Sequence, residues 1–291
     1  DIVEPGSSIK PLIMAAALDQ RIVKLNEIVD TTPGFVQVGA KTIRDHHDLG
    51  PISLTRLLAR SSNVGITKIA MRMQPEELWA ALVNYGFGQL TTVGFPGESA
   101  GLLNHFADWR PVSQATIGYG YGLSVTPLQL VRAYAALGNY GVIKPVSLLA
   151  IDEPVDGQRI LSEASSRAVL DMMEAVVLPG GTGNKASIAG YRVAGKTGTS
   201  RKLENGAYSA ERHFSVFAGL VPASAPRLAA VVVIDEPTGD DYYGGDVAAP
   251  VFSLVMTEAL RLLAIKPDDV PGLEQTLAAG ETSTQEKVAS R

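Results

Sequence analysis

The sequence predicts an α+β fold, in which an antiparallel sheet is flanked by helices and joined to a largely helical lobe. Helical patterns dominate the chain as far as residue 177, whereas strand patterns follow from residue 193. Only short connections separate the strand-like runs, which favours antiparallel pairing. Three strands make a small sheet for 291 residues, so we expect further strands to be contributed by sequence upstream of this chain.

The predicted helices have an apolar face at helical spacing, and several begin at a proline or a capping serine. The first helix, residues 7–20, follows the turn Pro5-Gly6. The others are expected at residues 52–60, 64–73, 75–85, 126–140, 162–177 and 251–263. Two segments rich in glycine and proline, residues 31–50 and 86–111, are expected to form turns and loops.

The predicted strands are short runs of apolar and β-branched residues near the end of the chain. They cover residues 193–195, which lead into a turn, residues 214–220 and residues 228–234. The last run is continuously apolar, which predicts a strand that is buried on both faces. From residue 265 the sequence is polar and without periodicity, so residues 265–291 are expected to form a disordered tail.

The composition is that of a globular protein, with 46% hydrophobic residues, 19% charged residues and a net charge of −5. This mild acidity, without a basic cluster, argues against a nucleic-acid partner. There are no cysteines and only four histidines, so we expect no disulfide, metal site or cofactor. One histidine, His213, lies in a strand-like run and is expected to be packed. The sequence shows no secretory signal and no apolar run long enough to span a membrane.

Three short strings in the sequence point to its chemistry. They are Ser7-Ser8-Ile9-Lys10, Ser61-Ser62-Asn63 and Lys196-Thr197-Gly198-Thr199. Taken singly, each string also fits an ordinary helix cap, loop or strand end. Together, and in this order, they match the Ser-x-x-Lys, Ser-x-Asn and Lys-Thr-Gly motifs of serine acyl-transfer enzymes.

The residue types of these motifs suit nucleophilic catalysis. A serine hydroxyl is a weak nucleophile at neutral pH and needs an adjacent base. Ser7 and Lys10 are three positions apart on the predicted helix and therefore share a face. Burial beside a second cation, for which Lys196 is the candidate, lowers the pKa of a lysine and makes it a base. Ser61 is expected to pass a proton between the two lysines and the leaving amine.

The remaining motif residues are expected to hold the substrate. The amide of Asn63 can bind a peptide bond as both donor and acceptor. The segment Thr197-Gly198-Thr199 can bind a substrate carboxylate through its two hydroxyls, with Lys196 adding positive charge. The oxyanion that forms when Ser7 attacks a carbonyl is expected to accept hydrogen bonds from the N–H groups of Ser7 and Thr199.

These motifs and the strings between them resemble the transpeptidase domain of class B penicillin-binding proteins of the septal, cell-division type. The similar strings are Glu4 through Pro11, Ser61 through Gly65, Tyr85 through Gly88, Phe95 through Glu98, Gly118 through Pro127, Tyr191 through Thr199, Tyr242 through Gly245 and Ala248 through Phe252. The resemblance covers residues 1–264, which we expect to form one transpeptidase domain. Because the sequence starts without methionine and close to Ser7, we expect this domain to lack its N-terminal part.

The resemblance implies a bacterial envelope enzyme that cross-links peptidoglycan, with Ser7 as nucleophile and Lys10 as base. It would attack the D-Ala-D-Ala end of one stem peptide, release D-alanine and pass the acyl group to an amine of another stem. β-Lactams would acylate Ser7 as substrate mimics, and Tyr119, Tyr121 and Tyr243 would line the cleft. The family also implies an inner-membrane anchor, a periplasmic catalytic domain, a role in septal synthesis and divisome partners bound through regions outside this chain.

Three other functions stay open at this point. A serine β-lactamase has the same motifs but needs a base that directs water at the acyl-serine. Glu98, which follows Asn63 by 35 residues, is the candidate, although its surroundings favour a turn residue. A D,D-carboxypeptidase differs only in using water as the acceptor, and a penicillin sensor would be acylated without turning over.

Overall fold

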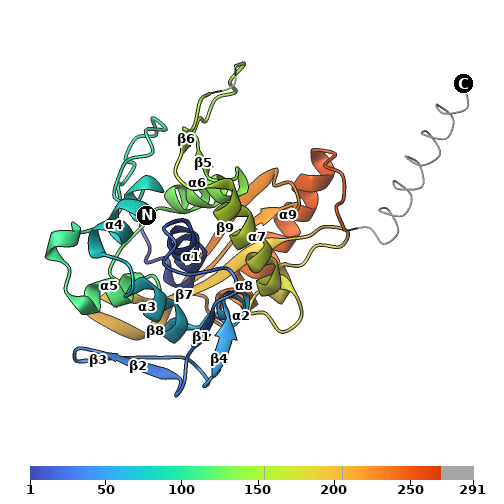
Figure 1. Cartoon of the computed structure of the whole chain (residues 1–291). Coiled ribbons are helices and arrows are strands. Elements are labelled where there is room, and N and C mark those ends of the chain that lie inside the picture. Colours follow the sequence, from blue (N-terminus) through green and yellow to red (C-terminus); the bar gives the residue numbers. More distant parts are fainter. Residues whose placement is uncertain (154, 205, 270–291) are drawn as a thin grey trace, which may run out of the picture.

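The structure is a computed structural model and describes residues 1–153, 155–204 and 206–269 (Figure 1). Its helices are α1 (Lys10–Asp19), α2 (Leu54–Ala59), α3 (Asn63–Ala70), α4 (Pro75–Asn84), α5 (Pro111–Ile117), α6 (Pro127–Gly138), α7 (Glu163–Val177), α8 (Gly244–Val247) and α9 (Ala249–Leu262). Short 3-10 helices are η1 (Gly6–Ile9), η2 (Phe106–Asp108) and η3 (Asn184–Ala186). The strands are β1 (Ile28–Asp30), β2 (Phe35–Val38), β3 (Lys41–Arg44), β4 (Pro51–Ser53), β5 (Val142–Ile143), β6 (Gln158–Arg159), β7 (Ala194–Glu204), β8 (Ala207–Val221) and β9 (Leu228–Asp235). Among these residues no helix combines the length and the apolarity needed to cross a bilayer.

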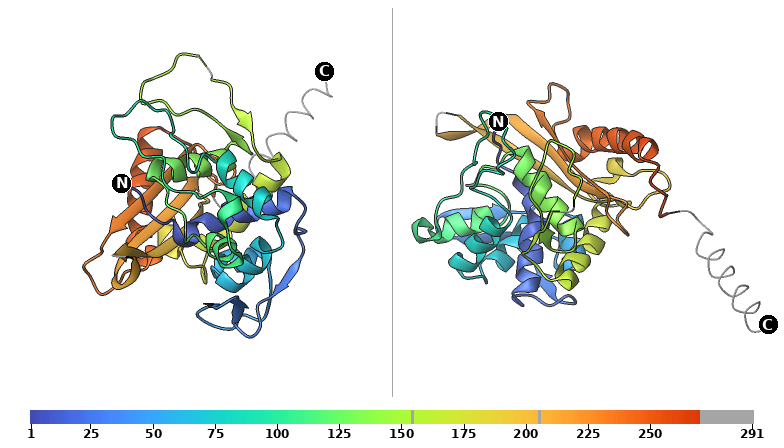
Figure 2. Two further views of the ribbon diagram at one scale, coloured as in Figure 1. Left: turned by 90° about the vertical axis from the view of Figure 1, so that its left-hand side faces the viewer. Right: turned by 90° about the horizontal axis from the view of Figure 1, so that it is seen from above.

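The main sheet consists of β7, β8 and β9 in that order, and both strand pairs are antiparallel. Alternate side chains of β8 point to opposite faces, as the pleat of a strand requires. Val216, Ala218 and Leu220 pack in the core shared with α1, α6 and α7, whereas Phe217 and Val221 pack with α9. Helices therefore cover both faces of the sheet, which confirms the predicted architecture (Figure 2).

Helix α1 lies at the centre of the molecule, between the sheet and the helical lobe (Figures 1 and 2). Every residue from Lys10 to Ala17 is buried, and the helix contacts α3, α4 and α7. A helix surrounded by protein needs apolar side chains on all sides. The sequence pattern indicated one apolar face, and the buried side chains of Met14 and Ala15 extend it around the helix. The predicted helix starting at residue 7 is in fact divided, because η1 precedes α1.

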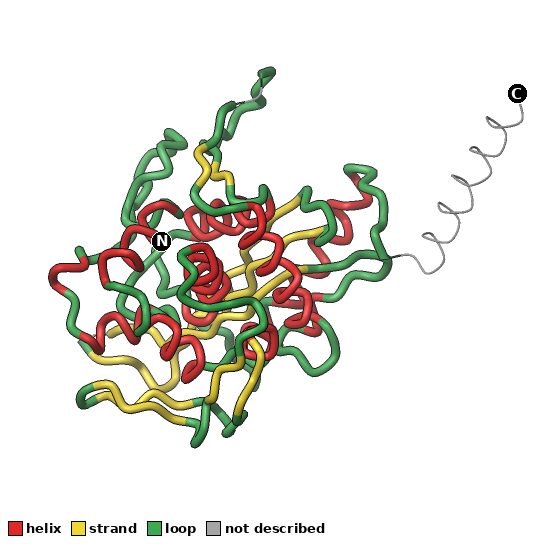
Figure 3. The backbone as a smooth tube through the Cα atoms, in the orientation of Figure 1, coloured by secondary structure: helices red, strands yellow, loops and turns green. Residues whose placement is uncertain are grey.

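The other predicted helices are present with shifted ends, but two helices, α5 and α8, were missed. Helix α5 follows the predicted loop, and its seven residues are too few to give a clear periodic pattern. Only turns were expected in residues 31–50, and this segment also contains the β2–β3 hairpin. The strands β1 and β4 pair beside it, and Figure 3 shows these short pairs apart from the main sheet.

Three strand predictions need correction. The first strand was expected at residues 193–195, before a turn, but β7 continues through the motif at residues 196–199 as far as Glu204. Strand β8 begins at Ala207, well before the predicted residue 214, because the exposed polar end of the β7–β8 hairpin has no apolar pattern to reveal it. Strand β9 is not fully buried: residues 228–234 are all half-buried. Among the described strands, β9 pairs with β8 alone. None of these strands pairs with the other edge of β9.

The beginning of the predicted tail is ordered against the domain. The hydroxyl of Tyr191 donates to the carbonyl oxygen of Ile265 at 2.6 Å, and the Asp268 carboxylate accepts hydrogen bonds from Arg192 and Ser224. The sequence predicted disorder for this whole tail, but residues 265–269 are packed against the domain. The rest of the predicted tail, residues 270–291, lies outside the described residues.

Candidate active site

The residues predicted to act on substrate lie around one cavity of about 1090 Å³, between β7 and the helical lobe. The predicted residues that line it are Ser7, Ser61, Asn63, Tyr119, Tyr121, Thr197, Gly198, Thr199 and Tyr243. Lys10 and Lys196 lie behind this lining and are fully buried. The structure thus brings together every residue that the sequence predicted for the site.

The turn that carries Ser7 packs closely against β7. Gly6 has a φ of +51°, and a Cβ at this position would lie 3.0 Å from the carbonyl oxygen of Thr199. A Cβ on Gly198 would lie 2.6 Å from the carbonyl oxygen of Pro5, which is closer than real Cβ contacts come. These two glycines allow the backbones of η1 and β7 to lie side by side. The arrangement supports the prediction that the N–H groups of Ser7 and Thr199 bind an oxyanion, which stays a prediction.

The two lysines converge on Ser61. Lys10 Nζ donates to Ser61 Oγ at 3.2 Å, to the Ser61 carbonyl oxygen at 2.6 Å and to Asn63 Oδ1 at 2.7 Å. Lys196 Nζ donates to Ser61 Oγ at 2.9 Å and to the Thr197 carbonyl oxygen at 3.1 Å. The Ser61 hydroxyl therefore lies between the two ammonium groups, where the sequence analysis expected it.

Ser7 and Lys10 share the beginning of the first helical segment, but the described residues show no hydrogen bond between the Ser7 hydroxyl and Lys10. All three Lys10 hydrogen bonds go to the segment Ser61–Asn63. A neutral amine has a lone pair and only two N–H donors. Loss of one proton from Lys10 therefore frees the nitrogen to accept a proton from Ser7.

Both lysines are easier to deprotonate than a lysine in water. Burial lowers the pKa of Lys10 well below its usual range, the charge of Lys196 lowers it further, and the carboxylate of Asp45 opposes the change. Burial lowers the pKa of Lys196 to about 7. The cause in both cases is the loss of hydration of a charged ammonium group. The site can therefore supply a neutral lysine as base and a second, charged lysine near neutral pH.

The segment Ser61–Asn63 is held by residues that the sequence analysis did not single out. Ser62 caps α3 by accepting the N–H of Gly65 at 2.8 Å. The carboxylate of Asp45 accepts hydrogen bonds from the N–H groups of Asn63 and Val64 and from the Ser62 hydroxyl. No sequence pattern connects Asp45 with this segment, because the contact joins the end of β3 to the start of a helix farther along the chain.

The threonine hydroxyls of the third motif are held by two other segments. Thr197 Oγ1 lies 2.9 Å from Thr182 Oγ1, and Thr199 Oγ1 accepts the N–H of Gly244 at 3.0 Å. Because the Thr199 oxygen already accepts a hydrogen bond, its O–H is available to donate into the cavity. Thr182 also lines the cavity. It lies in a glycine-rich loop without a recognisable motif, so the sequence analysis missed it.

The predicted tyrosines form two aromatic groups on the cavity wall. In one group the rings of Tyr119, Tyr121 and Tyr208 contact in series, with centroids 5.6 and 5.3 Å apart. The Tyr208 hydroxyl donates to Glu4 at 3.0 Å, and Glu4 also accepts the N–H of Gly122 at 2.7 Å. This carboxylate, three residues before the nucleophile, therefore joins the serine turn to the aromatic group.

The second aromatic group contains His213, for which the sequence predicted only packing. Tyr242 stacks on Tyr243 and on His213, with ring centroids 4.6 and 4.2 Å apart. His213 is buried, as the sequence predicted. It nevertheless also lines the cavity, because the Tyr242 ring holds it at the wall.

Glu98 does not reach the cavity. Its carboxylate accepts hydrogen bonds from the N–H and the hydroxyl of Thr91, in the loop that follows α4. It is absent from the residues that line the cavity. The structure therefore gives it the role of a loop-holding residue and not that of a base for water attack on the acyl-serine.

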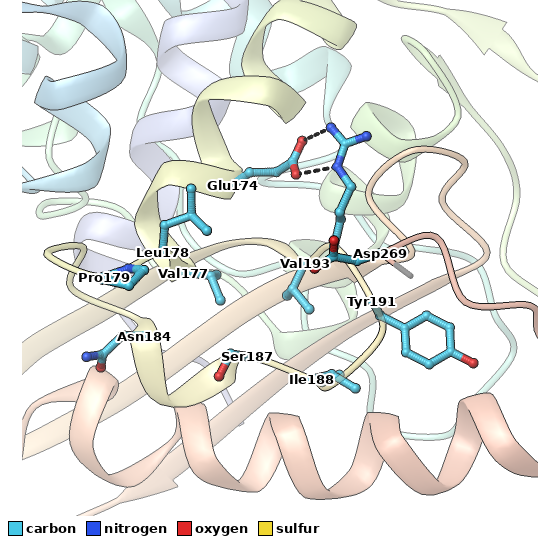
Figure 4. A pocket seen from close by; sticks show the side chains of 11 residues that line it. Glu174, Val177, Leu178, Pro179, Asn184, Ser187, Ile188, Tyr191, Val193 and Asp269 are labelled. Atoms are coloured by element: carbon cyan, nitrogen blue, oxygen red, sulfur yellow. Dashed lines mark hydrogen bonds and ion pairs between the residues drawn. The ribbon is translucent and has the colours of Figure 1, made fainter. Parts of the chain in front are cut away.

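A second, smaller cavity of about 440 Å³ lies beyond the end of α7, beside α9 (Figure 4). Apolar side chains such as Val177 and Ile188 form part of its lining. Arg192 and Glu174 meet at its border in a two-point ion pair, with N–O distances of 2.7 and 2.8 Å. None of the predicted site residues lines this cavity.

Two buried lysines on one serine hydroxyl, beside a helix-borne serine and the edge of a sheet, define a serine acyl-transfer domain of the penicillin-recognising type. The family model described as "Penicillin binding protein transpeptidase domain" matches residues 1–257. The chain therefore belongs to this transpeptidase family, as the sequence motifs indicated.

The relatives agree with this assignment. The chain is 42% identical over 268 residues to the peptidoglycan D,D-transpeptidase FtsI of Escherichia coli K12 and 43% identical over 267 residues to the probable peptidoglycan D,D-transpeptidase PenA of Neisseria meningitidis. These matches cover 92% of the chain and 45% and 46% of the relatives, so the chain spans about half their length. The apo transpeptidase domain of Burkholderia pseudomallei penicillin-binding protein 3 superposes with a TM-score of 0.88 at 41% identity, covering 92% of this chain and 82% of that one.

Proposed function

We propose that the protein is a peptidoglycan D,D-transpeptidase that carries its substrate as an ester on Ser7. The observation that carries this proposal is the convergence of Lys10 and Lys196 on the Ser61 hydroxyl, at the wall of the cavity that Ser7 lines. Lys10 and Lys196 lie 51 and 135 positions from Ser61 in the sequence, yet the three motifs form one polar centre. The relatives named as D,D-transpeptidases support the reaction, and no metal or cofactor is needed for it.

In the first half-reaction, Ser7 Oγ forms a bond to the carbonyl carbon of the penultimate D-alanine of a stem peptide. The hydroxyl proton passes to the neutral amine of Lys10, and the carbonyl oxygen becomes an oxyanion. Collapse of this intermediate breaks the peptide bond, and the leaving amine takes a proton through the Ser61 hydroxyl. Terminal D-alanine leaves, and the donor remains as an acyl ester on Ser7.

In the second half-reaction, an amine from another stem peptide attacks the ester carbon. Its proton returns through the same lysine and serine groups to Ser7 Oγ, and the new peptide bond forms the cross-link. The hydroxyl of Thr199 and the charge of Lys196 hold the carboxylate of the donor before the first step. A β-lactam acylates Ser7 in the same way, but its leaving group stays attached to the acyl group and hinders the second step.

The biological setting is part of the proposal. The similarity to FtsI supports a role in septal cell-wall synthesis, with stem peptides as donor and acceptor. We place the catalytic domain in the periplasm, anchored to the inner membrane and joined to divisome proteins through regions outside this chain.

The direct test is mass spectrometry of the protein after incubation with benzylpenicillin. We expect a stable adduct on the peptide that contains Ser7, and its complete loss in Ser7→Ala. The matched control is Ser8→Ala, because the Ser8 hydroxyl is buried against the carbonyl oxygen of Pro5 and does not line the cavity. An adduct that persists in Ser7→Ala would overturn the assignment of the nucleophile.

A second assay separates the transferase from the hydrolases. A donor that ends in D-Ala-D-Ala is incubated with a D-amino acid acceptor, and products are resolved by chromatography. A transpeptidase gives the acceptor adduct in addition to free D-alanine, whereas a carboxypeptidase gives the hydrolysed donor alone. Rapid turnover of benzylpenicillin would instead identify a β-lactamase.

A further inference from the structure

We propose that Asp45 is a positioning residue for acyl transfer, which holds Ser61 and Asn63 in the geometry that binds the catalytic amine of Lys10. This inference rests on the proposed function, because it concerns the same reaction. Asp45 follows β3 directly and is half-buried. It contributes to the cavity lining, yet its hydrogen bonds are made to the backbone and side chains around the second motif.

The carboxylate of Asp45 binds the start of α3 at three points. Oδ1 accepts the N–H groups of Asn63 and Val64, the latter at 3.0 Å, and Oδ2 accepts the Ser62 hydroxyl. The first N–H groups of a helix have no partner within the helix, and a negative charge at this end is favourable. One side chain thus holds three consecutive residues, the last two of the second motif and Val64.

Asp45 and its neighbour also set the direction of the Asn63 amide. Asn63 Nδ2 donates to the carbonyl oxygen of Arg44 at 3.1 Å, which leaves Oδ1 pointing at Lys10 Nζ, 2.7 Å away. The end of β3 therefore holds both the backbone and the side chain of Asn63. If the end of β3 moved, Asn63 Nδ2 would lose its hydrogen bond to the carbonyl oxygen of Arg44. The amide would then be free to rotate its oxygen away from Lys10.

A simple helix cap would not need this arrangement. Ser62 already caps α3 through the N–H of Gly65 at 2.8 Å. The bonds from Asp45 act closer to Ser61, at the Ser62 hydroxyl and at the N–H groups of Asn63 and Val64. Ser61 supplies two of the three acceptors of Lys10, and its φ of +57° is one that non-glycine residues rarely adopt. Such a conformation persists only where the surrounding structure holds it, and Asp45 holds the three residues that follow Ser61.

Asp45 also acts on Lys10 through its charge. Its carboxylate raises the pKa of Lys10, whereas burial and the charge of Lys196 lower it. Removal of the negative charge should therefore make Lys10 a weaker base and shift its deprotonation to lower pH. This effect is separate from geometry, so the two contributions of Asp45 can be measured with different variants.

The test compares Asp45→Ala, Asp45→Asn and Asp48→Asn with the wild type in stopped-flow acylation by a fluorescent penicillin. The first-order acylation constant, k2, should fall by about 10- to 100-fold in Asp45→Ala, as misplaced catalytic groups typically cause, with little change in the binding constant. Asp45→Asn keeps an oxygen acceptor for the two N–H groups and should recover part of this loss. Asp48→Asn is the matched control, because the Asp48 carboxylate lies in the same loop and accepts the N–H of Gly50 at 2.9 Å. This variant should acylate like the wild type.

Two further measurements keep the test decisive if Asp45→Ala folds poorly. Active-site titration gives the fraction of folded protein, so k2 is obtained for active molecules alone. In Asp45→Asn, the acidic limb of the plot of k2 against pH should move to lower pH. A wild-type k2 and pH profile in both Asp45 variants would overturn the positioning role, as would a loss of active fraction with unchanged k2. Absence of a Ser7 adduct in the wild type would instead overturn the proposed function.

Discussion

Ser61 has a φ of +57°, in the left-handed region that costs a non-glycine residue conformational energy. In this conformation its carbonyl oxygen and its hydroxyl both face Lys10, and the hydroxyl also meets Lys196. The motif pattern predicted the hydroxyl but not the backbone angle. The angle depends on the turn between α2 and α3 and on Asp45, which pins the residues after it.

A pair of substitutions at Ser61 separates the two features. Ser61→Ala and Ser61→Gly both remove the hydroxyl, so both should lose acylation by penicillin. Glycine adopts the positive φ without strain, so Ser61→Gly should be more stable than Ser61→Ala by about 1 kcal/mol in urea unfolding. Equal stabilities would show that the angle at Ser61 is not strained in solution.

At the scale of elements, the site depends on the close approach of η1, β7 and the loop after α5. Gly6 donates its N–H to the carbonyl oxygen of Gly120 at 3.0 Å, and a Cβ on Gly120 would lie 2.0 Å from the Gly6 carbonyl oxygen. Gly198, which also lacks a Cβ, allows β7 to approach the same turn closely. The glycine-rich string around position 120 was recognised in the sequence, but its function as a backbone support for the nucleophile turn was visible only in the structure.

Gly120→Ala should therefore displace the turn that carries Ser7. We expect it to slow acylation and to reduce the free energy of unfolding, by about 1–2 kcal/mol for the positive φ and about 1–3 kcal/mol more for the overlap. Gly97→Ala is the matched control, because its φ of +79° is similar to the +90° of Gly120 and no described atom lies within 4 Å of its Cβ position. Urea unfolding and penicillin acylation of both variants check this. Equal losses of stability and normal acylation in both would contradict it.

At the scale of the molecule, folding places the ends of two distant segments in one buried site. Lys10 comes from the central helix and Lys196 from the edge of the sheet, and both are fully buried beside Ser61. Each loses its hydration there, so the pKa of each is lowered. The large core that excludes water from this region, and not the motifs alone, lowers the pKa of both lysines, as the roles proposed for them require.

The second-order rate constant of acylation should therefore decrease as pH rises above about 7, where Lys196 loses its charge. Below this pH Lys196 is protonated and attracts the penicillin carboxylate; above it the attraction disappears. This rate constant reports the free protein, so the unliganded pKa applies. The methyl ester of the same penicillin has no carboxylate and should lack this alkaline decrease. Identical pH profiles for the acid and the ester would show that Lys196 does not bind the carboxylate through its charge.

From the sequence alone we predicted the motif residues, the main helices and the antiparallel pairing of the last three strands. Motifs such as Ser7 to Lys10 are local, and periodic apolar patterns reveal helices regardless of what packs on them. The packed fold was needed to see that Asp45 and Thr182 hold the second and third motifs, and that Glu98 stays in its loop. The physical reason is that the contacts of Asp45 and Thr182 join different elements, so they depend on how those elements pack. The contact of Glu98 lies within one loop, whose path no periodic pattern reveals.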